Sequence, residues 1–411
     1  MVAMRAASSP STEIRETSDA ETASDVCLQR FSVPYEYPIF FTAGAFDPVN
    51  PTLARAASRL EPDRNHRVLA VIDDGVAAVT PDLLESVTAY ARAHATSVSL
   101  AGRPELVPGG EAAKVSSAVV DIVLERIRDA KIDRKSCVLV IGGGAVQDAV
   151  GYAASIAHRG VRLIRMPTTV ESQCDSGVGV KTAINAFGMK NYVGTFAPPF
   201  AVINDRRFLT TLSSRDVRAG MAEAVKVALL RDPSFFEWLW RNAEDLAACE
   251  PGAIRHLIRR TAELHLEHIA HAGDPFELGA AKPLDYGHWA AHKLESLSQY
   301  ELRHGEAVAI GLVIDSRYAV ERGMLSEQVV ARLCVLLERL GFTLWHEALA
   351  TRTASGPRAV IAGLEEFREH LGGALTLTML GDVGHPIDAG NIDVAGMESA
   401  IAWLDFRSRS R

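Results

Sequence analysis

The chain has 411 residues, 48% of them hydrophobic and 23% charged, and a formal net charge of −8. This length allows two domains, and the composition is ordinary for a soluble globular protein. The negative charge argues against a nucleic-acid-binding protein, and no apolar run approaches the roughly eighteen residues of a membrane span. The five cysteines lack metal-binding spacing, so we expect free thiols in a reducing compartment and a cytoplasmic protein.

Residues 1–27 are polar and rich in Ser, Thr, Glu and Ala. They lack the apolar core of a secretion signal, so we expect a disordered tail. The next segment, 31–41, has the spacing of a strand, and its prolines indicate an edge strand.

Strands and helices then alternate as far as about residue 170. Apolar strands are expected at 68–72, 97–100, 137–141 and 161–165. Helices are expected at 81–94, from the loop 108–114 to about 130, and at 145–157. This alternation with short Gly-rich turns is typical of a parallel sheet covered by helices, which we assign to an α/β domain at 28–210.

Beyond residues 205–215 the hydrophobic period becomes helical. We therefore expect an α-helical domain at 211–411, with one strand at 374–380. The predicted helices are 215–231, 233–247, 251–272, 286–299, 304–323, 326–340, 357–371 and 395–405.

A glycine turn, Gly142–Gly144, follows the buried strand 137–141 and begins a helix. Glycines let the backbone approach a pyrophosphate, and a helix N-terminus supplies free N–H groups and a positive dipole. The alternative is a tight turn that binds nothing. Asp73 or Asp74, at the end of an earlier strand, would accept the ribose hydroxyls of NAD and would favour NAD over NADP.

The stretch 167–185 combines small residues with Asp175 and Lys181, and Lys190 and Asn191 follow it. Two lysines in a Gly-rich loop suit a phosphate and a hydroxylated ligand. A solvated surface loop is the alternative, but apolar residues interleave the polar ones.

Three histidines lie in apolar sequence. His288 and His292 are four residues apart and share a helix face, and His304 precedes another apolar run. Glu223 also has apolar neighbours, so its carboxylate would need a partner if buried. Two imidazoles and one carboxylate make a usual catalytic zinc site with one open position. The alternatives are hydrogen-bonded core histidines and a surface pair between Glu223 and Lys226.

Eight short motifs follow one another in a fixed order. They are GGExxK from Gly109, GGGxxxD from Gly142, PTT from Pro167, DxxxGxK from Asp175, GMKN from Gly188, AExxK from Ala222, GHxxxH from Gly287 and HGEAV from His304. Together they resemble the dehydroquinate synthase family, also called the sugar phosphate cyclases, from about residue 109 to 311 and more loosely to about 384.

The resemblance implies a Rossmann-like NAD-binding domain, an all-α metal-binding domain and an active site between them in a homodimer. It implies that Glu223, His288 and His304 hold zinc or cobalt. The implied NAD contacts are Asp73 or Asp74, Glu111, Lys114, Gly143, Gly144, Asp148, Thr168 and Thr169, with Lys181 and Lys190 nearby. The implied substrate contacts are Asp175, Lys181, Lys190, Asn191, Lys226, Asp285 and His292, with Arg159 at the phosphate end, reaching across the dimer.

The family chemistry begins with hydride transfer from a secondary alcohol of a seven-carbon sugar phosphate to NAD. The ketone acidifies the neighbouring C–H, phosphate leaves by β-elimination and hydride returns. The ring then opens, and the resulting enolate closes a carbocycle by aldol addition. NAD ends unchanged.

The chain departs from dehydroquinate synthases where they bind the substrate carboxylate. The family Arg is replaced by Ala281, with Lys282 adjacent to it, and the family Asn is Asp285. A family Lys further upstream falls on Glu267 if Asp274 is aligned with the family's acidic turn, so we expect Glu267 beside the substrate. These changes, with Val180, favour the cyclitol-forming branch and sedoheptulose 7-phosphate, which has a hydroxymethyl group instead. The alternatives are 3-dehydroquinate synthase itself and a metal-dependent alcohol dehydrogenase.

Overall fold

The computed structural model describes residues 27–271, 275–276, 283–354, 356–371 and 375–410. The chain forms two compact units, 1–36 and 37–411. Every helix and strand of the described residues belongs to the second unit. The predicted tail, 1–27, lies outside the described residues except for the exposed Cys27. None of the described helices is long and apolar enough to cross a membrane.

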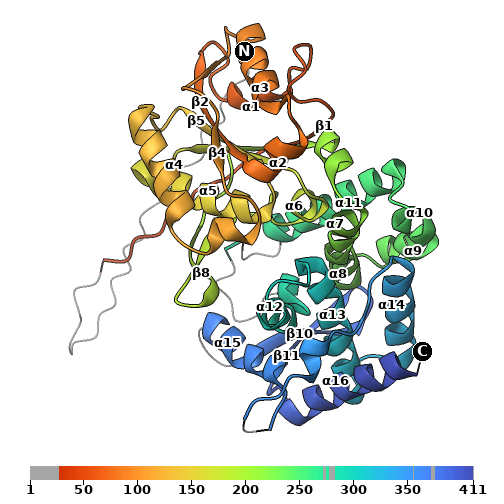
Figure 1. The fold of residues 1–411 in the computed structure, drawn as a ribbon. Coiled ribbons are helices and arrows are strands. Elements are labelled where there is room, and N and C mark those ends of the chain that lie inside the picture. The colour runs from red at the N-terminus through yellow and green to blue at the C-terminus, as the bar shows by residue number, and fades with distance from the viewer. Residues whose placement is uncertain (1–26, 272–274, 277–282, 355, 372–374, 411) are drawn as a thin grey trace, which may run out of the picture. The chain divides into compact units, whose positions relative to one another are not determined.

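A seven-stranded parallel sheet forms the centre of the first half of the second unit (Figure 1). Its order is β1–β9–β6–β5–β2–β3, and β4 also pairs with β2. Every residue of β5 is buried, as expected for a parallel sheet with both faces covered. The strands are β1 Ile39–Thr42, β2 His66–Asp73, β3 Val98–Leu100, β4 Glu105–Val107, β5 Cys137–Gly142, β6 Arg162–Pro167 and β9 Ala201–Asp205.

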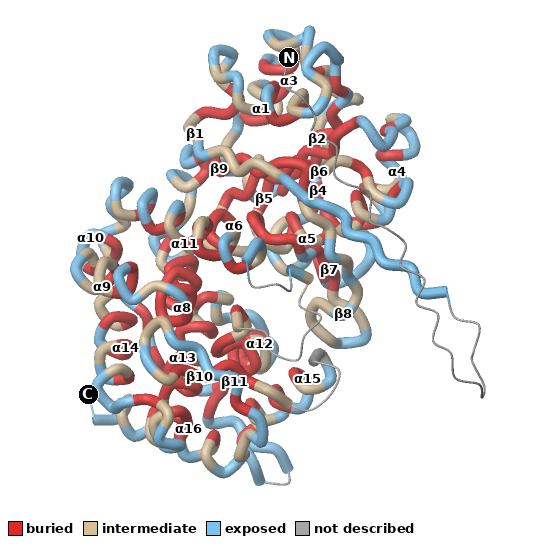
Figure 2. Tube along the Cα trace, turned by 180° about the vertical axis from the view of Figure 1, so that it is seen from behind, coloured by how far each residue is buried: buried red, intermediate tan, exposed pale blue. Residues whose placement is uncertain are grey.

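Helices cover both faces of this sheet, and the strands appear as a buried layer between them (Figure 2). Leu139 and Ile141 pack into a core with α1 and α3, whereas Val138 and Val140 pack into a second core with α4 and α5. Alternate side chains of one strand thus serve opposite faces. The helices are α1 Thr52–Ala57, α2 Asp74–Val79, α3 Leu83–Ala93, α4 Ala118–Asp129, α5 Gly144–Ile156 and α6 Val170–Cys174.

The predicted parallel sheet is confirmed, and β1 is an edge strand as expected. Among the strands, β4, β9 and an antiparallel hairpin of β7 (Lys181–Ala186) and β8 (Met189–Phe196) were not predicted, and neither were the short helices α1, α2 and α6. The sequence in this region is rich in small and polar residues, so we interpreted it as a loop.

The second half consists mainly of helices around one large apolar core. It is not all-α, because the predicted strand near 374–380 is present as β10 (Thr376–Asp382) and pairs with an unpredicted strand, β11 (His385–Gly390). The helices are α7 Ser214–Ala219, α8 Met221–Arg231, α9 Pro233–Arg241, α10 Ala243–Ala247, α11 Pro251–His271, α12 His288–Leu297, α13 His304–Glu321, α14 Glu327–Arg339, α15 Ala362–Leu371 and α16 Val394–Arg409. The compact unit runs without a break from 37 to 411, so a division at 210/211 stays a prediction.

Candidate active site

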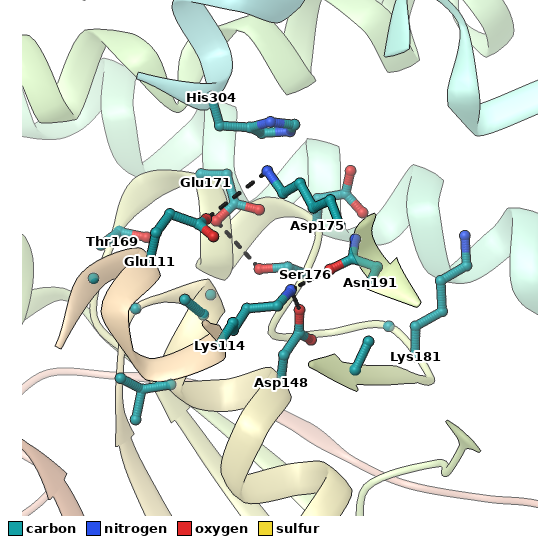
Figure 3. Close-up of a pocket in the computed structure, with 18 of the residues that line it drawn as sticks. Glu111, Lys114, Asp148, Thr169, Glu171, Asp175, Ser176, Lys181, Asn191 and His304 are labelled. Carbon is teal, nitrogen blue, oxygen red and sulfur yellow. Dashed lines mark hydrogen bonds and ion pairs between the residues drawn. The ribbon is translucent and has the colours of Figure 1, made fainter. Parts of the chain in front are cut away.

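The carboxyl ends of β2, β5 and β6 open onto a cavity of about 960 Å³, which α8, α12 and α13 also line (Figure 3). The strand register brings these ends together, since Ile72 pairs with Ile141 and Gly142 with Pro167. Most residues predicted to bind cofactor, substrate or metal line this cavity. They are Asp73, Glu111, Lys114, Gly143, Gly144, Asp148, Thr168, Thr169, Asp175, Lys181, Lys190, Asn191, Lys226, Asp285, His288, His292 and His304.

Three predicted site residues do not line the cavity. Glu223 is 1% exposed and faces His288 and His304 from inside the protein. The Asp74 carboxylate accepts a hydrogen bond from the Gly109 backbone N–H at 3.0 Å. Arg159 is exposed on the chain surface, so its predicted contact across a dimer stays a prediction.

The predicted metal ligands come together from three helices. Glu223 Oε1 lies 3.6 Å from His288 Nε2 and 3.5 Å from His304 Nε2. Among the described residues, neither carboxylate oxygen of Glu223 has a hydrogen-bond donor in good geometry, although Lys226 forms an ion pair with Oε2. One carboxylate oxygen and two imidazole nitrogens therefore converge on one point.

The outer nitrogens of the two imidazoles decide what this point can hold. His288 Nδ1 lies 3.0 Å from the Tyr286 carbonyl oxygen, and His304 Nδ1 lies 3.2 Å from Glu295 Oε2. Both partners are acceptors, so each neutral ring carries its proton on Nδ1 and turns an Nε2 lone pair toward Glu223. In these neutral tautomers three electron-pair donors converge, which fits a metal cation, and the Nδ1 partners are those that orient metal-binding histidines.

Close packing of helices sets this arrangement. A Cβ on Gly311 of α13 would overlap the carbonyl oxygen of Gly287, which precedes α12 and has a φ of +78°. A Cβ on Gly305 would overlap the Ala219 carbonyl oxygen at the end of α7. The two glycines of α13 thus let this helix approach the start of α12, which carries His288, and the start of α8, which carries Glu223.

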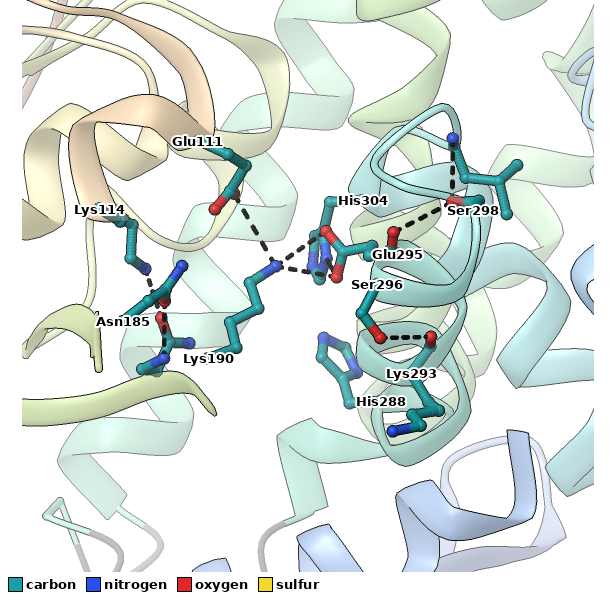
Figure 4. A network of polar contacts seen from close by, with 12 residues as sticks. Glu111, Lys114, Asn185, Lys190, His288, Lys293, Glu295, Ser296, Ser298 and His304 are labelled. Carbon is teal, nitrogen blue, oxygen red and sulfur yellow. Dashed lines mark hydrogen bonds and ion pairs between the residues drawn. The ribbon is translucent and has the colours of Figure 1, made fainter. Parts of the chain in front are cut away.

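A second cluster lies on the other side of His304 (Figure 4). Both oxygens of Glu295 lie 2.8 Å from Lys190 Nζ, and Lys190 also lies 3.8 Å from Glu111. His292, Glu295 and His304 are near enough to form a second candidate cation site. Because the Lys190 ammonium already pairs with both oxygens of Glu295, we assign the metal to the Glu223 side.

The charges of the two clusters reinforce each other. Burial tends to lower the pKa of His304, but the carboxylates of Glu295 and Glu223 outweigh this effect and raise it to about 10. Burial likewise opposes the charge of Glu295, yet His304 and Lys190 hold its pKa below the usual range. A positive charge is therefore favoured between the two carboxylates.

The glycine turn after β5 leaves the N-terminus of α5 without a side-chain cap. The N-cap of α5, Gly143, offers no side-chain cap, so the first N–H groups of this helix have no such partner. A Cβ on Gly144 would approach Ser176 Oγ to 2.7 Å and Glu171 Oε2 to 2.9 Å. Asp73 accepts hydrogen bonds from the backbone of Gly75 and Val76, and burial raises its pKa. An uncapped helix N-terminus beside glycines fits a pyrophosphate.

Two lysines that line the cavity, Lys226 and Lys114, pair with acidic and amide groups. Lys226 Nζ lies 3.1 Å from Asp175 Oδ2, and Lys114 Nζ lies 2.6 Å from Asp148 Oδ2. Lys114 also donates to the Asn191 side chain. Both ammonium groups are therefore paired in this structure.

Sequence analysis did not predict four residues at this site. Buried Arg165 of β6 donates to the carbonyls of Ser176, Gly179 and Lys181 and so fixes the loop before β7. Its signal in the sequence is a charge inside an apolar strand. The others are cavity-lining Glu171, His265 and Glu295. Burial raises the pKa of Glu171 to about 7.

The expectation for Glu267 is wrong. Its side chain is 54% exposed, does not line the cavity and lies 3.6 Å from Arg260. On α11 it points away from His265 and Ile269, the two residues of this helix that line the cavity. Ala281 and Lys282 lie outside the described residues, and Asp285 lines the cavity as predicted.

The chain is similar to known proteins over most of its length. Residues 105–219 match the family model for the 3-dehydroquinate synthase N-terminal region, and residues 220–356 match the model for the C-terminal region. A 2-epi-valiolone synthase from Actinosynnema mirum is 32% identical over 87% of this chain and 91% of its own length. A 3-dehydroquinate synthase from Nitratiruptor sp. is 41% identical over 59% of this chain and 69% of its own.

The fold is also similar to that of a solved structure. A 2-epi-5-epi-valiolone synthase from Streptomyces hygroscopicus subsp. jinggangensis 5008, with NAD+ and Zn2+ bound, superposes with a TM-score of 0.79 at 28% identity. The match covers 92% of this chain and 100% of that one. The two family models and the Actinosynnema relative show that the chain belongs to the dehydroquinate synthase family of sugar phosphate cyclases.

Proposed function

We propose that this family member is a NAD- and metal-dependent cyclase that converts sedoheptulose 7-phosphate into a C7 cyclitol, 2-epi-valiolone or 2-epi-5-epi-valiolone, with release of phosphate. The observation that carries the proposal is one cavity lined by His288 and His304 of the Glu–His–His cluster, by the open N-terminus of α5 and by four lysines. The relatives from Actinosynnema and Streptomyces carry names of this branch. We also propose a cytoplasmic homodimer.

Two bound groups would supply the chemistry that side chains lack. A zinc or cobalt ion held by Glu223, His288 and His304 would polarise a substrate alcohol and the ketone formed from it. NAD held at the turn of Gly143 and Gly144 would accept and return hydride.

The chain's own residues would bind and orient the substrate. The Lys226–Asp175 pair stands next to Glu223, where it can hold hydroxyl groups beside the metal ligands. Lys181 and Lys190 line the cavity from β7 and β8, and their ammonium groups would neutralise phosphate. Fixed charges of this kind lower the barrier to loss of a phosphate dianion because they need no reorganisation.

Asp285 supports the choice of substrate. Its side chain lines the cavity at the position where dehydroquinate synthases carry an amide. A carboxylate there repels the carboxylate of a heptulosonate but accepts a hydrogen bond from a hydroxymethyl group. The second candidate, 3-dehydroquinate synthase, is supported by the identity to the Nitratiruptor enzyme.

The test is phosphate release by the purified enzyme with NAD and zinc, measured separately with sedoheptulose 7-phosphate and with the heptulosonate phosphate of dehydroquinate synthases. We expect release from the first substrate only, without accumulation of absorbance at 340 nm. Release from the heptulosonate alone would establish the second candidate. Stoichiometric NADH formation would instead indicate an alcohol dehydrogenase.

A further inference from the structure

Helix α11 contributes an imidazole to the cavity that neither the motifs nor the proposed chemistry assigns. The His265 side chain is 11% exposed, and its Nδ1 lies 3.0 Å from Asp175 Oδ1. The partner is a carboxylate, so Nδ1 carries the proton and donates it. Burial lowers the pKa of His265, which keeps the ring neutral, with a single N–H.

The other face of the ring is fixed by the loop that carries Asp175. A Cβ on Gly179 would lie 3.0 Å from His265 Nε2 and 3.6 Å from the Asp175 carbonyl oxygen. The Gly179 N–H donates to that same carbonyl, and the Gly179 carbonyl accepts from buried Arg165. His265 therefore packs against a loop that cannot easily shift, and its Nδ1–H points at one oxygen of Asp175.

Asp175 is thereby held from two helices at once. Oδ1 accepts from His265 of α11, and Oδ2 lies 3.1 Å from Lys226 Nζ of α8. Lys226 in turn pairs with Glu223. A continuous line of contacts runs from His265 through Asp175 and Lys226 to the carboxylate of the metal cluster.

We propose that His265 is a positioning residue of this active site: its Nδ1–H sets the rotation of the Asp175 carboxylate and so the place of Lys226 beside the metal ligands. The inference rests on the proposed function for what Asp175 and Lys226 bind, but its geometry does not depend on the substrate. Loss of the Nδ1 donor frees Asp175 to turn, and a misplacement of about 1 Å in a substrate-holding group costs about a hundredfold in rate.

Two amide substitutions separate the donor from the ring. In His265→Asn the amide nitrogen stands near the position of Nδ1 and can donate to Asp175, whereas in His265→Gln it stands near Nε2. We expect the Asn variant to keep kcat within about threefold, and the Gln variant to lose about 10- to 100-fold in kcat with a smaller change in KM. His268→Asn is the matched control, because His268 is also buried on α11 but does not line the cavity.

Zinc content and crystal structures of the two variants complete the test. Both variants should retain zinc, and only the Gln variant should show Asp175 Oδ2 displaced from Lys226. Equal kcat in the two variants, or an unmoved Asp175 in the Gln variant, would overturn the proposal. If the parent enzyme releases no phosphate from either sugar, the proposed function fails, while the position of Asp175 in the two crystal structures still decides the role of His265.

Discussion

The two clusters on either side of His304 contain the same kinds of group but are built differently. On one side, Glu223, His288 and Lys226 come from α8 and α12, buried in the helical core. On the other side, Glu295 comes from α12, but its partner Lys190 comes from the hairpin strand β8. The residues of the first cluster all come from helices that pack together, whereas the second cluster depends on where the hairpin lies.

From this difference we infer that the two clusters have different roles. The helical cluster can keep its geometry whether or not a substrate is present, as a metal site requires. The second cluster connects the hairpin, which carries the proposed phosphate-binding residue Lys190, to Nδ1 of the proposed metal ligand His304. We expect changes on the helical side to remove the metal, and changes on the hairpin side to weaken substrate binding and tune the metal.

The largest effect should come from His304→Ala, which removes the residue that the clusters share. The variant should fold, contain no stoichiometric zinc and release no phosphate, because a site with two remaining ligands cannot hold the ion tightly. Zinc is measured by mass spectrometry after gel filtration. His271→Ala, an exposed histidine of α11, should keep full occupancy.

Asp315 of α13, which holds the start of α12, should make the free energy of unfolding depend on pH. Burial raises the pKa of Asp315 to about 7, although it accepts hydrogen bonds from the Gly287 N–H and Trp289 Nε1 at the start of α12. A raised pKa means that folding favours the neutral carboxyl. The contribution of Asp315 to the free energy of unfolding is therefore present below about pH 4 and is lost as the pH rises through about 7. The change is about 4 kcal/mol.

The difference in unfolding free energy between the parent and Asp315→Asn should therefore vary across this range, because the variant cannot titrate at this position. Chemical denaturation at several pH values measures it. A difference that stays constant between about pH 4 and pH 7.5 would show that Asp315 is charged in the folded protein.

On the hairpin side, Lys190→Met should lower the free energy of unfolding by about 3 kcal/mol, since it leaves the buried carboxylate of Glu295 without its ammonium partner. Zinc should remain bound. Lys190→Arg, which keeps the charge, should lose less stability. Loss of zinc as complete as in His304→Ala would contradict the division between the clusters.

The sequence predicted the helical cluster better than the hairpin side, for a physical reason. Helical period and apolar context are local, so they marked Glu223 and the three histidines as candidates, and the family resemblance then implied Glu223, His288 and His304. The Lys190–Glu295 pair joins residues 105 positions apart and depends on the register of β7 with β8. No local pattern encodes that distance.

Helical phase also explains the error at Glu267. His265 and Ile269 are four residues apart and share the face of α11 that lines the cavity, whereas a residue two positions after His265 points to the opposite side. The comparison with the family pattern identified the correct helix, α11. The alignment depended on Asp274, which lies outside the described residues, and it placed the substituted position on the wrong face of this helix. The side chain that reaches Asp175 is His265.

The smallest of these effects should come from Glu295→Gln. The amide oxygen can still accept from His304 Nδ1, but the charge that strengthens this hydrogen bond is gone. Partners of metal-bound histidines typically contribute about 10- to 100-fold to metal affinity. Competition with a chelator of known affinity should show a loss in this range, and an unchanged affinity would show that Glu295 does not orient His304.

The most direct measurement is the position of the ion itself. Anomalous diffraction at the zinc edge, from crystals of the parent enzyme grown with zinc, locates it without reference to activity. We predict one strong peak within about 2.0–2.2 Å of Glu223 Oε1, His288 Nε2 and His304 Nε2. A peak instead among His292, Glu295 and His304 Nδ1, with Lys190 displaced, would contradict the assignment of the metal to the helical cluster.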